Sequence, residues 1–131
     1  MSSDLWTQCA VMSANYRVIP EERLVSVRFA AILSFRDIQG YAAALRTDPL
    51  FEPDFSEIVD LSEVEKIEIN AMETMRLADV VDPFDIDAKR VFVAQTELQI
   101  HAARMHHLLR DAAGKTHICS SLADARKWIE S

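Results

Sequence analysis

The sequence has very little of the residues that build common small binding loops. It contains two glycines, Gly40 and Gly114, which cannot form a G-x-G-x-x-G nucleotide-binding turn or a phosphate-binding P-loop. It also contains only two cysteines, Cys9 and Cys119, which lie far apart and form no C-x-x-C pair. We therefore expect two free thiols, and neither a cysteine zinc site nor a redox dithiol.

Basic residues and long apolar runs are scarce as well. The chain has 14 Lys and Arg against 21 Asp and Glu, a formal net charge of -7, so we expect no nucleic acid partner. No apolar run approaches the roughly 20 residues that cross a bilayer, so we expect no membrane insertion. Asp4 precedes any basic residue and no stretch of signal-peptide type follows, which predicts a cytoplasmic protein.

The overall composition is that of a folded globular chain. Half of the residues are hydrophobic and 27% are charged, and 131 residues are enough for one domain but too few for two of similar size. Residues 1–15 show no clear period, and we interpret them as a lead segment. Residues 16–131 form the predicted domain.

Five short runs have the alternation or the β-branched content of strands. They are residues 16–19, 24–30, 57–61, 90–94 and 116–119. The first two are separated by a turn that starts at Pro20, which predicts a hairpin. Each of the others is followed by a helical pattern.

Four helix starts are marked by an N-cap residue with an acid or amide three positions later, an arrangement that satisfies free backbone N–H groups. The pairs are Ser34 with Asp37, Asn70 with Glu73, Thr96 with Gln99, and Ser121 with Asp124. The third helix also carries an apolar stripe before a stop at Gly114. That stripe consists of Leu98, Ala102, Met105, Leu109 and Ala112.

The resulting order is β-β-α-β-α-β-α-β-α. Strands that alternate with helices predict an α/β fold with a mostly parallel five-stranded sheet, four helices and right-handed crossovers. In this arrangement only the first strand runs antiparallel.

Four phrases of the sequence support a family resemblance. They are YRVIPEERLVSVRF from Tyr16, LRTDPLFEPDF from Leu45, IVDLSEV from Ile58 and ARKWI from Ala125. With the order of elements, they resemble the SpoIIAA-like proteins of bacteria, which belong with the STAS domains. The resemblance covers roughly residues 16–129 and implies a SpoIIAA-like fold, a bacterial source and a regulatory role.

In phospho-regulated members of that family, which antagonise anti-sigma factors, a D-L-S stretch ends a strand and a D-S-S-G motif opens the next helix. Asp60, Leu61 and Ser62 match the first motif. Residues 68–71 (E-I-N-A) fall where the second would be, so both serines and the glycine are absent. We predict that an anti-sigma-type kinase does not phosphorylate residues 69–71.

The resemblance places the functional surface at the helix start formed by Asn70 and Ala71. The free backbone N–H groups there could bind an anion, or Asn70 could serve only as the N-cap of its helix. Met72, Met75 and Met105 on the second and third helices either contact an apolar ligand or partner, or fill the core. The related Sec14-type folds hold lipids beside the sheet.

The histidine and hydroxyl residues predict neither a metal site nor catalysis. His101 lies five and six positions before His106 and His107, whereas a helical metal pair needs a spacing of three or four. Cys119 and Ser121 stand near a helix start, where a thiol pKa can fall, but no G-x-S-x-G elbow accompanies them. We expect no catalytic residue, no metal and no cofactor.

We therefore predict a non-catalytic binding or regulatory module of the SpoIIAA/STAS type. One alternative is a carrier of a small apolar ligand or lipid, held near Met75 and Met105, and another is an enzyme of unrecognised type. We expect the partner to be another protein or a second copy in a homodimer. The candidate apolar patch consists of Leu5, Trp6, Val11, Met12, Val81, Pro83, Phe84 and Ile86.

Overall fold

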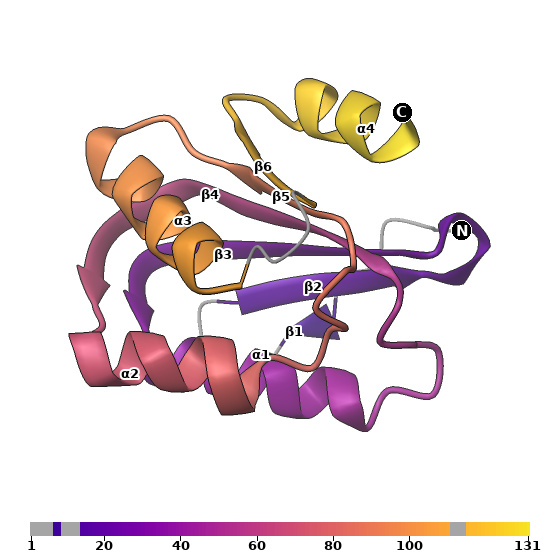
Figure 1. Cartoon of the computed structure of the whole chain (residues 1–131), viewed down its shortest axis with the longest axis horizontal. Coiled ribbons are helices and arrows are strands. Elements are labelled where there is room, and N and C mark those ends of the chain that lie inside the picture. The colour runs from indigo at the N-terminus through magenta and orange to yellow at the C-terminus, as the bar shows by residue number, and fades with distance from the viewer. Residues whose placement is uncertain (1–6, 9–13, 111–114) are drawn as a thin grey trace.

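The computed structural model describes residues 7–8, 14–110 and 115–131, and its strands form one six-stranded sheet in sequence order (Figure 1). The strands are β1 (Thr7–Gln8), β2 (Ala14–Ile19), β3 (Leu24–Ser34), β4 (Ser56–Glu68), β5 (Arg90–Val93) and β6 (Thr116–Cys119). Strand β2 runs antiparallel to both of its neighbours, and β3 to β6 are parallel. The predicted α/β fold, with its first strand antiparallel, is confirmed. The short β1 is a sixth strand that the sequence does not predict, and β2 begins two residues earlier than predicted, within the lead segment.

All four predicted cap residues begin a helix. The helices are α1 (Phe35–Arg46), α2 (Ala71–Arg76), α3 (Glu97–Arg110) and α4 (Leu122–Glu130). Helix α2 continues as the π-helix η2 (Leu77–Val81). A short 3-10 turn, η1 (Pro20–Glu22), joins β2 to β3. At Ser34, Asn70 and Ser121 the side-chain oxygen accepts a hydrogen bond from the backbone N–H three residues on. Thr96 does the same for Gln99, at 3.2 Å. Local hydrogen bonding thus sets each helix start, as the sequence pattern predicts.

The helices cover the two faces of the sheet unequally. Helices α1, α2 and α3 lie on one face, and α4 lies alone on the other (Figure 1). Alternate residues of β3 face opposite sides, so Val25 and Val27 pack in the larger core and Leu24 packs on the α4 side. The larger core therefore lies between the sheet and three helices.

Strands β3 and β4 are longer than the sequence predicts, because the register between them shifts twice. Strand β4 continues to Glu68, seven residues past the predicted end at Leu61. Arg28 pairs with Asp60, but Ala30 pairs with Glu63, and a second shift follows Ala31, whose φ is 59°. Such bulges bend a strand pair and raise its twist. The Asp60–Ser62 stretch thus lies within a strand and not at its end.

The predicted apolar patch is wrong for two of its residues. Val81 and Phe84 are 6% and 4% exposed, and the Phe84 ring packs edge-on against Phe51 at 5.1 Å. Phe84 packs in the larger core, and Val81 packs with Ala42 and Leu77 in a separate cluster, so neither side chain is available to a partner surface. Ile86 is 55% exposed. Leu5, Trp6, Val11 and Met12 lie outside the described residues, as do Ala112, Gly114 and the Leu109 side chain.

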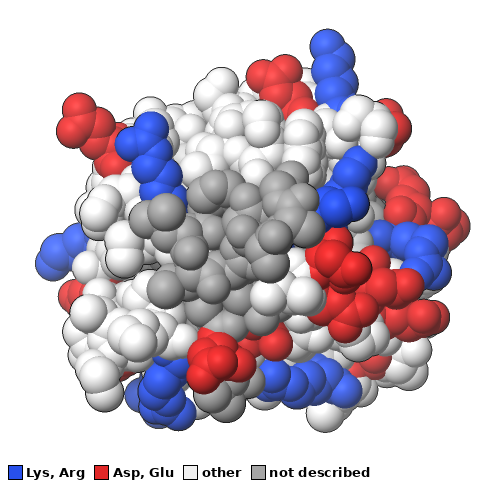
Figure 2. All heavy atoms as spheres, viewed as in Figure 1, with Lys and Arg blue, Asp and Glu red and all other residues white. Residues whose placement is uncertain are grey.

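The surface carries scattered charges. On the face shown in Figure 2, Lys and Arg side chains stand apart from one another and the described residues form no continuous basic patch. No helix within the described ranges is long and apolar enough to cross a membrane.

Candidate functional site

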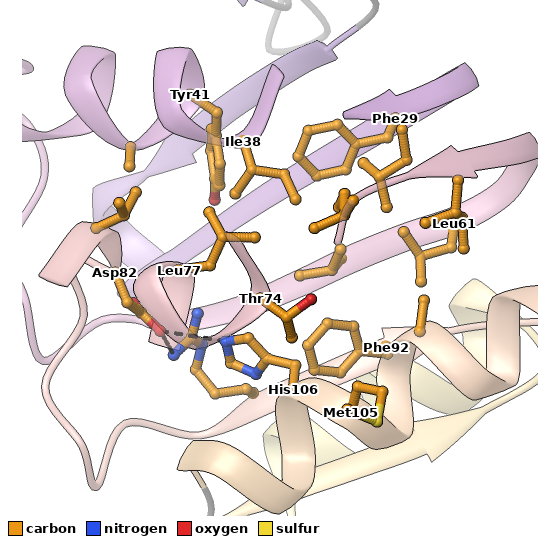
Figure 3. Close-up of a pocket in the computed structure, with 18 of the residues that line it drawn as sticks. Phe29, Ile38, Tyr41, Leu61, Thr74, Leu77, Asp82, Phe92, Met105 and His106 are labelled. Atoms are coloured by element: carbon orange, nitrogen blue, oxygen red, sulfur yellow. Dashed lines mark hydrogen bonds and ion pairs between the residues drawn. The ribbon is translucent and has the colours of Figure 1, made fainter. Parts of the chain in front are cut away.

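A cavity of about 460 Å³ lies between the sheet and helices α1, α2 and α3. Its walls are mostly apolar, and they combine side chains from strands β3 to β5 with the inner faces of the three helices (Figure 3). The apolar lining includes Phe29, Leu33, Ile38, Val59, Leu61, Ile67, Ile69, Leu77, Phe92, Leu98 and Met105. This volume is in the range of pockets that bind small molecules.

Short and small elements leave this space open. Helix α2 has only six residues and buries none of them, so it covers the sheet without filling the layer beneath it. The alanines Ala42, Ala71 and Ala102 face the cavity from α1, α2 and α3. The bend of β3 and β4 also carries the ends of these strands toward α2, as Figure 1 shows. The cavity follows from these three features together.

One end of the cavity is polar, and it begins with a pair across two strands. The Arg90 guanidinium contacts Glu57 Oε1 through Nε at 2.7 Å and through Nη2 at 2.6 Å. The Tyr41 hydroxyl donates to the other carboxylate oxygen, Oε2, at 2.6 Å. Their exposed fractions are 2% for Glu57, 4% for Tyr41 and 6% for Arg90. This is a charge-assisted network almost fully removed from water.

The network continues through Asp82 to His106. Arg90 Nη1 donates to Asp82 Oδ2 at 2.8 Å, and His106 Nε2 lies 3.3 Å from the same oxygen. The backbone N–H of Phe84 donates to Asp82 Oδ1 at 3.0 Å and fixes the carboxylate at the end of η2. The His106 ring packs on Phe92 with centroids 5.3 Å apart. We call these five residues, Tyr41, Glu57, Asp82, Arg90 and His106, the polar cluster.

Burial and pairing set the protonation of the polar cluster. Burial opposes the charge on Asp82, but the hydrogen bond from His106 and the Arg90 charge outweigh it and hold the pKa of Asp82 below its usual value. Burial also opposes the charge on Arg90, yet Glu57 and Asp82 raise the pKa of Arg90 further. Burial and the neighbouring Glu57 raise the pKa of Tyr41. Asp82 and Arg90 are therefore ionised and Tyr41 is neutral.

His106 is neutral in this arrangement. Burial, with the nearby Arg90 charge, lowers the pKa of His106 below 6.5 despite its contact with Asp82. With Nε2–H donating to Asp82, Nδ1 keeps a lone pair, and among the described residues this buried atom has no hydrogen-bond partner. A proton on Nδ1 would be buried without an acceptor, which is a second reason for the neutral form.

The structure separates the residues that the sequence analysis grouped. Asn70 is exposed, accepts from the Glu73 N–H at 2.8 Å and donates its own N–H to Glu73 at 3.1 Å, which makes it one half of a capping box. Ala71 and Met105 line the cavity. Met72 and Met75 are 72% and 58% exposed and are not among the cavity-lining residues.

Sequence reasoning missed the polar cluster, although a signal for part of it was present. Glu57 and Arg90 are the first residues of two predicted strands, E-I-V-D-L and R-V-F-V-A. A charged residue at the start of a buried strand is costly unless it is paired. Two such residues of opposite charge, each at the start of a predicted parallel strand, therefore indicate a buried ion pair between the strands. The sequence gives no comparable signal for the other three members of the polar cluster, Tyr41, Asp82 and His106, because only tertiary packing brings them to the ion pair.

The candidate nucleophile and metal ligands gain no support. Cys119 is half-buried, its pKa is raised by burial, and its thiol lies 3.4 Å from the carbonyl oxygen of Ser121. Burial is the largest influence on the pKa of this thiol, and it opposes formation of the reactive thiolate. Among the side chains that the structure describes, no three from His, Cys, Asp or Glu gather as a metal site would require.

Comparison with known structures identifies the type of fold. No protein-family model and no curated protein matches the sequence. A crystal structure of an uncharacterized protein of the DUF3478 family from Shewanella loihica PV-4, described as having a SpoIIAA-like fold, is similar over 98% of both chains. The TM-score is 0.61 and the sequence identity is 17%. The chain therefore has a SpoIIAA-like fold.

Proposed function

We propose that this protein is a non-catalytic binding module and that a small, largely apolar ligand occupies the cavity under α1, α2 and α3. The observation that carries the proposal is the cavity itself, about 460 Å³ of mostly apolar space with polar groups at one end. Ligand sites have this composition: apolar walls provide affinity, and a few converging polar groups orient the ligand.

The energetics favour an apolar occupant. The cavity is far larger than the space that one water molecule needs, which is about 10–15 Å³ by the same kind of measure. Water beside walls such as Phe29 and Leu61 lacks hydrogen-bond partners there, so an apolar body displaces it favourably. Each buried methylene contributes about 0.8 kcal/mol. A ligand of modest size would thus bind without any covalent or metal contact.

The entrance lies between α2 and α3. Leu98 and His101 from α3 and Ala71 from α2 line the cavity and are also exposed to solvent, so they mark where the cavity opens. Helix α2 buries no residue, and Thr74 extends its side of the cavity wall. Movement of this short helix would widen the opening at little cost in core packing.

The lining chemistry favours binding over catalysis. Two hydroxyls of described residues line the cavity: Tyr41, whose raised pKa keeps it protonated, and Thr74, which donates to the Asn70 carbonyl at 3.0 Å. Of the histidines that line the cavity, His106 already contacts Asp82 through Nε2 and its second nitrogen is buried, which disfavours its use as a general base. The cluster is therefore suited to orient a ligand.

The test is binding of N-phenyl-1-naphthylamine, a neutral apolar dye whose fluorescence rises in apolar sites. Ala102→Phe places a ring in the cavity and should abolish the signal. The control Ala43→Phe adds the same ring to the exposed face of α1 and should leave it unchanged. Equal dye binding by both variants, each shown by circular dichroism to be folded, would place the dye elsewhere and reject the proposal.

A further inference from the structure

We propose that helix α2 regulates access to the cavity by a one-residue shift of its register, which replaces Ala71 and Thr74 at the cavity wall with Met72 and Met75. This inference rests on the proposed function and adds a means by which that site is closed when no ligand fills it. Its basis is the position of the two methionines together with the π-helix η2 that follows them.

The cavity-lining and the exposed side chains of α2 differ by one position in the chain. Ala71 and Thr74 line the cavity, and the Thr74 side chain points into it in Figure 3. Met72 and Met75 follow them directly and are largely exposed. An α-helix turns by about 100° per residue, so a rotation of α2 by that angle would bring each methionine to the place of the residue before it.

The π-helix supplies the extra residue that this rotation needs. The backbone N–H of Asp82 donates to the Leu77 carbonyl at 3.0 Å, a bond between residues five apart instead of the four of an α-helix. The turn therefore holds one residue more than an α-turn. If it changes to α geometry while its carboxyl end stays in place, each position along α2 passes to the next residue in the chain. Turns of this kind are frequent at functional sites.

The two ends of the segment formed by α2 and η2 are held very differently. At the carboxyl end, Arg46 donates to the Val81 carbonyl at 2.6 Å, and the polar cluster holds the residue that follows. Helix α2 buries none of its residues, and an exposed capping box fixes its start. Rotation of α2 gives up that box and the contact of Arg76 with Phe35, and it displaces one buried side chain, Leu77. The end of η2 keeps its contacts.

Filling the cavity offsets these losses. After the shift, Met72 and Met75 leave water and contact apolar walls such as Phe92, and the burial of apolar area is favourable in proportion to that area. Methionine is unbranched and adapts to irregular gaps, which suits a side chain that enters and leaves a cavity. A bound ligand occupies the same space and holds α2 in the register that the structure shows. The ligand and the two methionines therefore compete for one volume.

Methionine oxidation tests this exchange directly. The protein is treated briefly with hydrogen peroxide, with and without bound N-phenyl-1-naphthylamine, and peptide mass spectrometry gives the rate at each methionine. We expect the dye to raise the rates at Met72 and Met75 at least about threefold, because it displaces them into water. It should lower the rate at Met105, which stays in the cavity wall. Bound dye that leaves the rates at Met72 and Met75 unchanged, or lowers them, would overturn the inference.

A double variant measures the competition as an affinity. A closed form that holds two molecules in three weakens dye binding about threefold, so Met72→Ala with Met75→Ala should tighten it at least about threefold. Leu50→Ala is the control, because it shortens an exposed apolar side chain that does not line the cavity, and it should leave the affinity unchanged. Equal or weaker dye binding by the folded double variant would overturn the inference and leave the proposed function intact. If the unsubstituted protein binds no dye, the proposed function itself is rejected.

A deletion in η2 tests the source of the movement. Removal of the exposed Asp79 takes out the extra residue of the π-turn and should hold α2 in its present register. We expect this variant to bind the dye, with oxidation rates at Met72 and Met75 that no longer respond to it. A response that persists in the folded deletion variant would show that the π-turn does not drive the exchange, which would overturn the register shift.

Discussion

Glu57 and Arg90 are direct register partners on the parallel strands β4 and β5, and their side chains form a two-contact ion pair under the helices. This pair joins the sheet to the cavity, because Tyr41 from α1 and Asp82 from the end of η2 attach to its two sides. The same side chains thus tie α1 and η2 to the sheet and form the polar end of the candidate site.

Removing the central cation should be strongly destabilising. Arg90→Met removes the cation that contacts both buried carboxylates, Glu57 and Asp82, and we expect a loss of about 3–5 kcal/mol in the free energy of unfolding. Arg126→Met is the control, because its pair with Glu22 is roughly half exposed and should contribute less than about 1 kcal/mol. Urea unfolding measures both. Similar losses for the two variants would contradict the buried network.

Acidification should destabilise the fold through His106. Its pKa is lower in the folded state than the ordinary 6.5, so the unfolded chain binds the proton first, and stability present above pH 6.5 is lost as pH falls below it. The groups that face this ring are Asp82, Arg90, Glu57 and Phe92. Asp82 contributes little in this window, because its folded pKa is depressed and its stabilisation is lost only at more acidic pH.

The measurement is urea unfolding at pH 7.5, 6.5 and 5.5. His106→Gln cannot take up the proton, so its stability should change less over this range than that of the unsubstituted protein. His101→Gln, an exposed position on the same helix, is the control and should retain the full dependence. An unchanged slope in His106→Gln would assign the pH dependence to another group.

Phosphorylation by an anti-sigma-type kinase should leave residues 69–71 unmodified, since that turn has no hydroxyl group. The two hydroxyls nearest in the chain are engaged: Ser62 donates to Asp60 at 2.6 Å, and Thr74 donates to the Asn70 carbonyl. Phosphopeptide mapping after incubation with such a kinase is the test. Modification of Ser62 or Thr74 would show that the regulatory site has moved within the fold.

We also propose that the protein forms a homodimer, as small domains with exposed apolar side chains often do. Met72 and Met75 stand one helical turn apart on α2, and both are largely exposed. Sedimentation over a wide concentration range should show a dimer, and Met72→Ser with Met75→Ser should weaken it. A monomer at every concentration would refute self-association, and an unaffected dimer would exclude α2 from the interface.

The helix starts and the succession of strands and helices along the chain were predictable because their signals are local. A cap residue and its partner at N3 are three positions apart, as at Ser34 and Asp37, so their hydrogen bonds depend on the nearby chain alone. The alternation of residue types along residues 24–29 likewise indicates a single strand with one buried face. The methionines show where such reasoning stops, because helical spacing alone does not say which side of a short helix meets the core.

By itself, therefore, the sequence determined the capped helix starts and the α/β order, since each depends on residues close together in the chain, and the alternation of strands with helices then implied a mostly parallel sheet. Only the tertiary structure decided the cavity and its polar end. Tyr41, Glu57, Asp82 and His106 come from four separate elements, and their meeting around Arg90 depends on the bend of β3 and β4, the shortness of α2 and the packing of α3. Buried charges are stabilised by partners in space, and nothing in the local sequence specifies which distant elements will supply them.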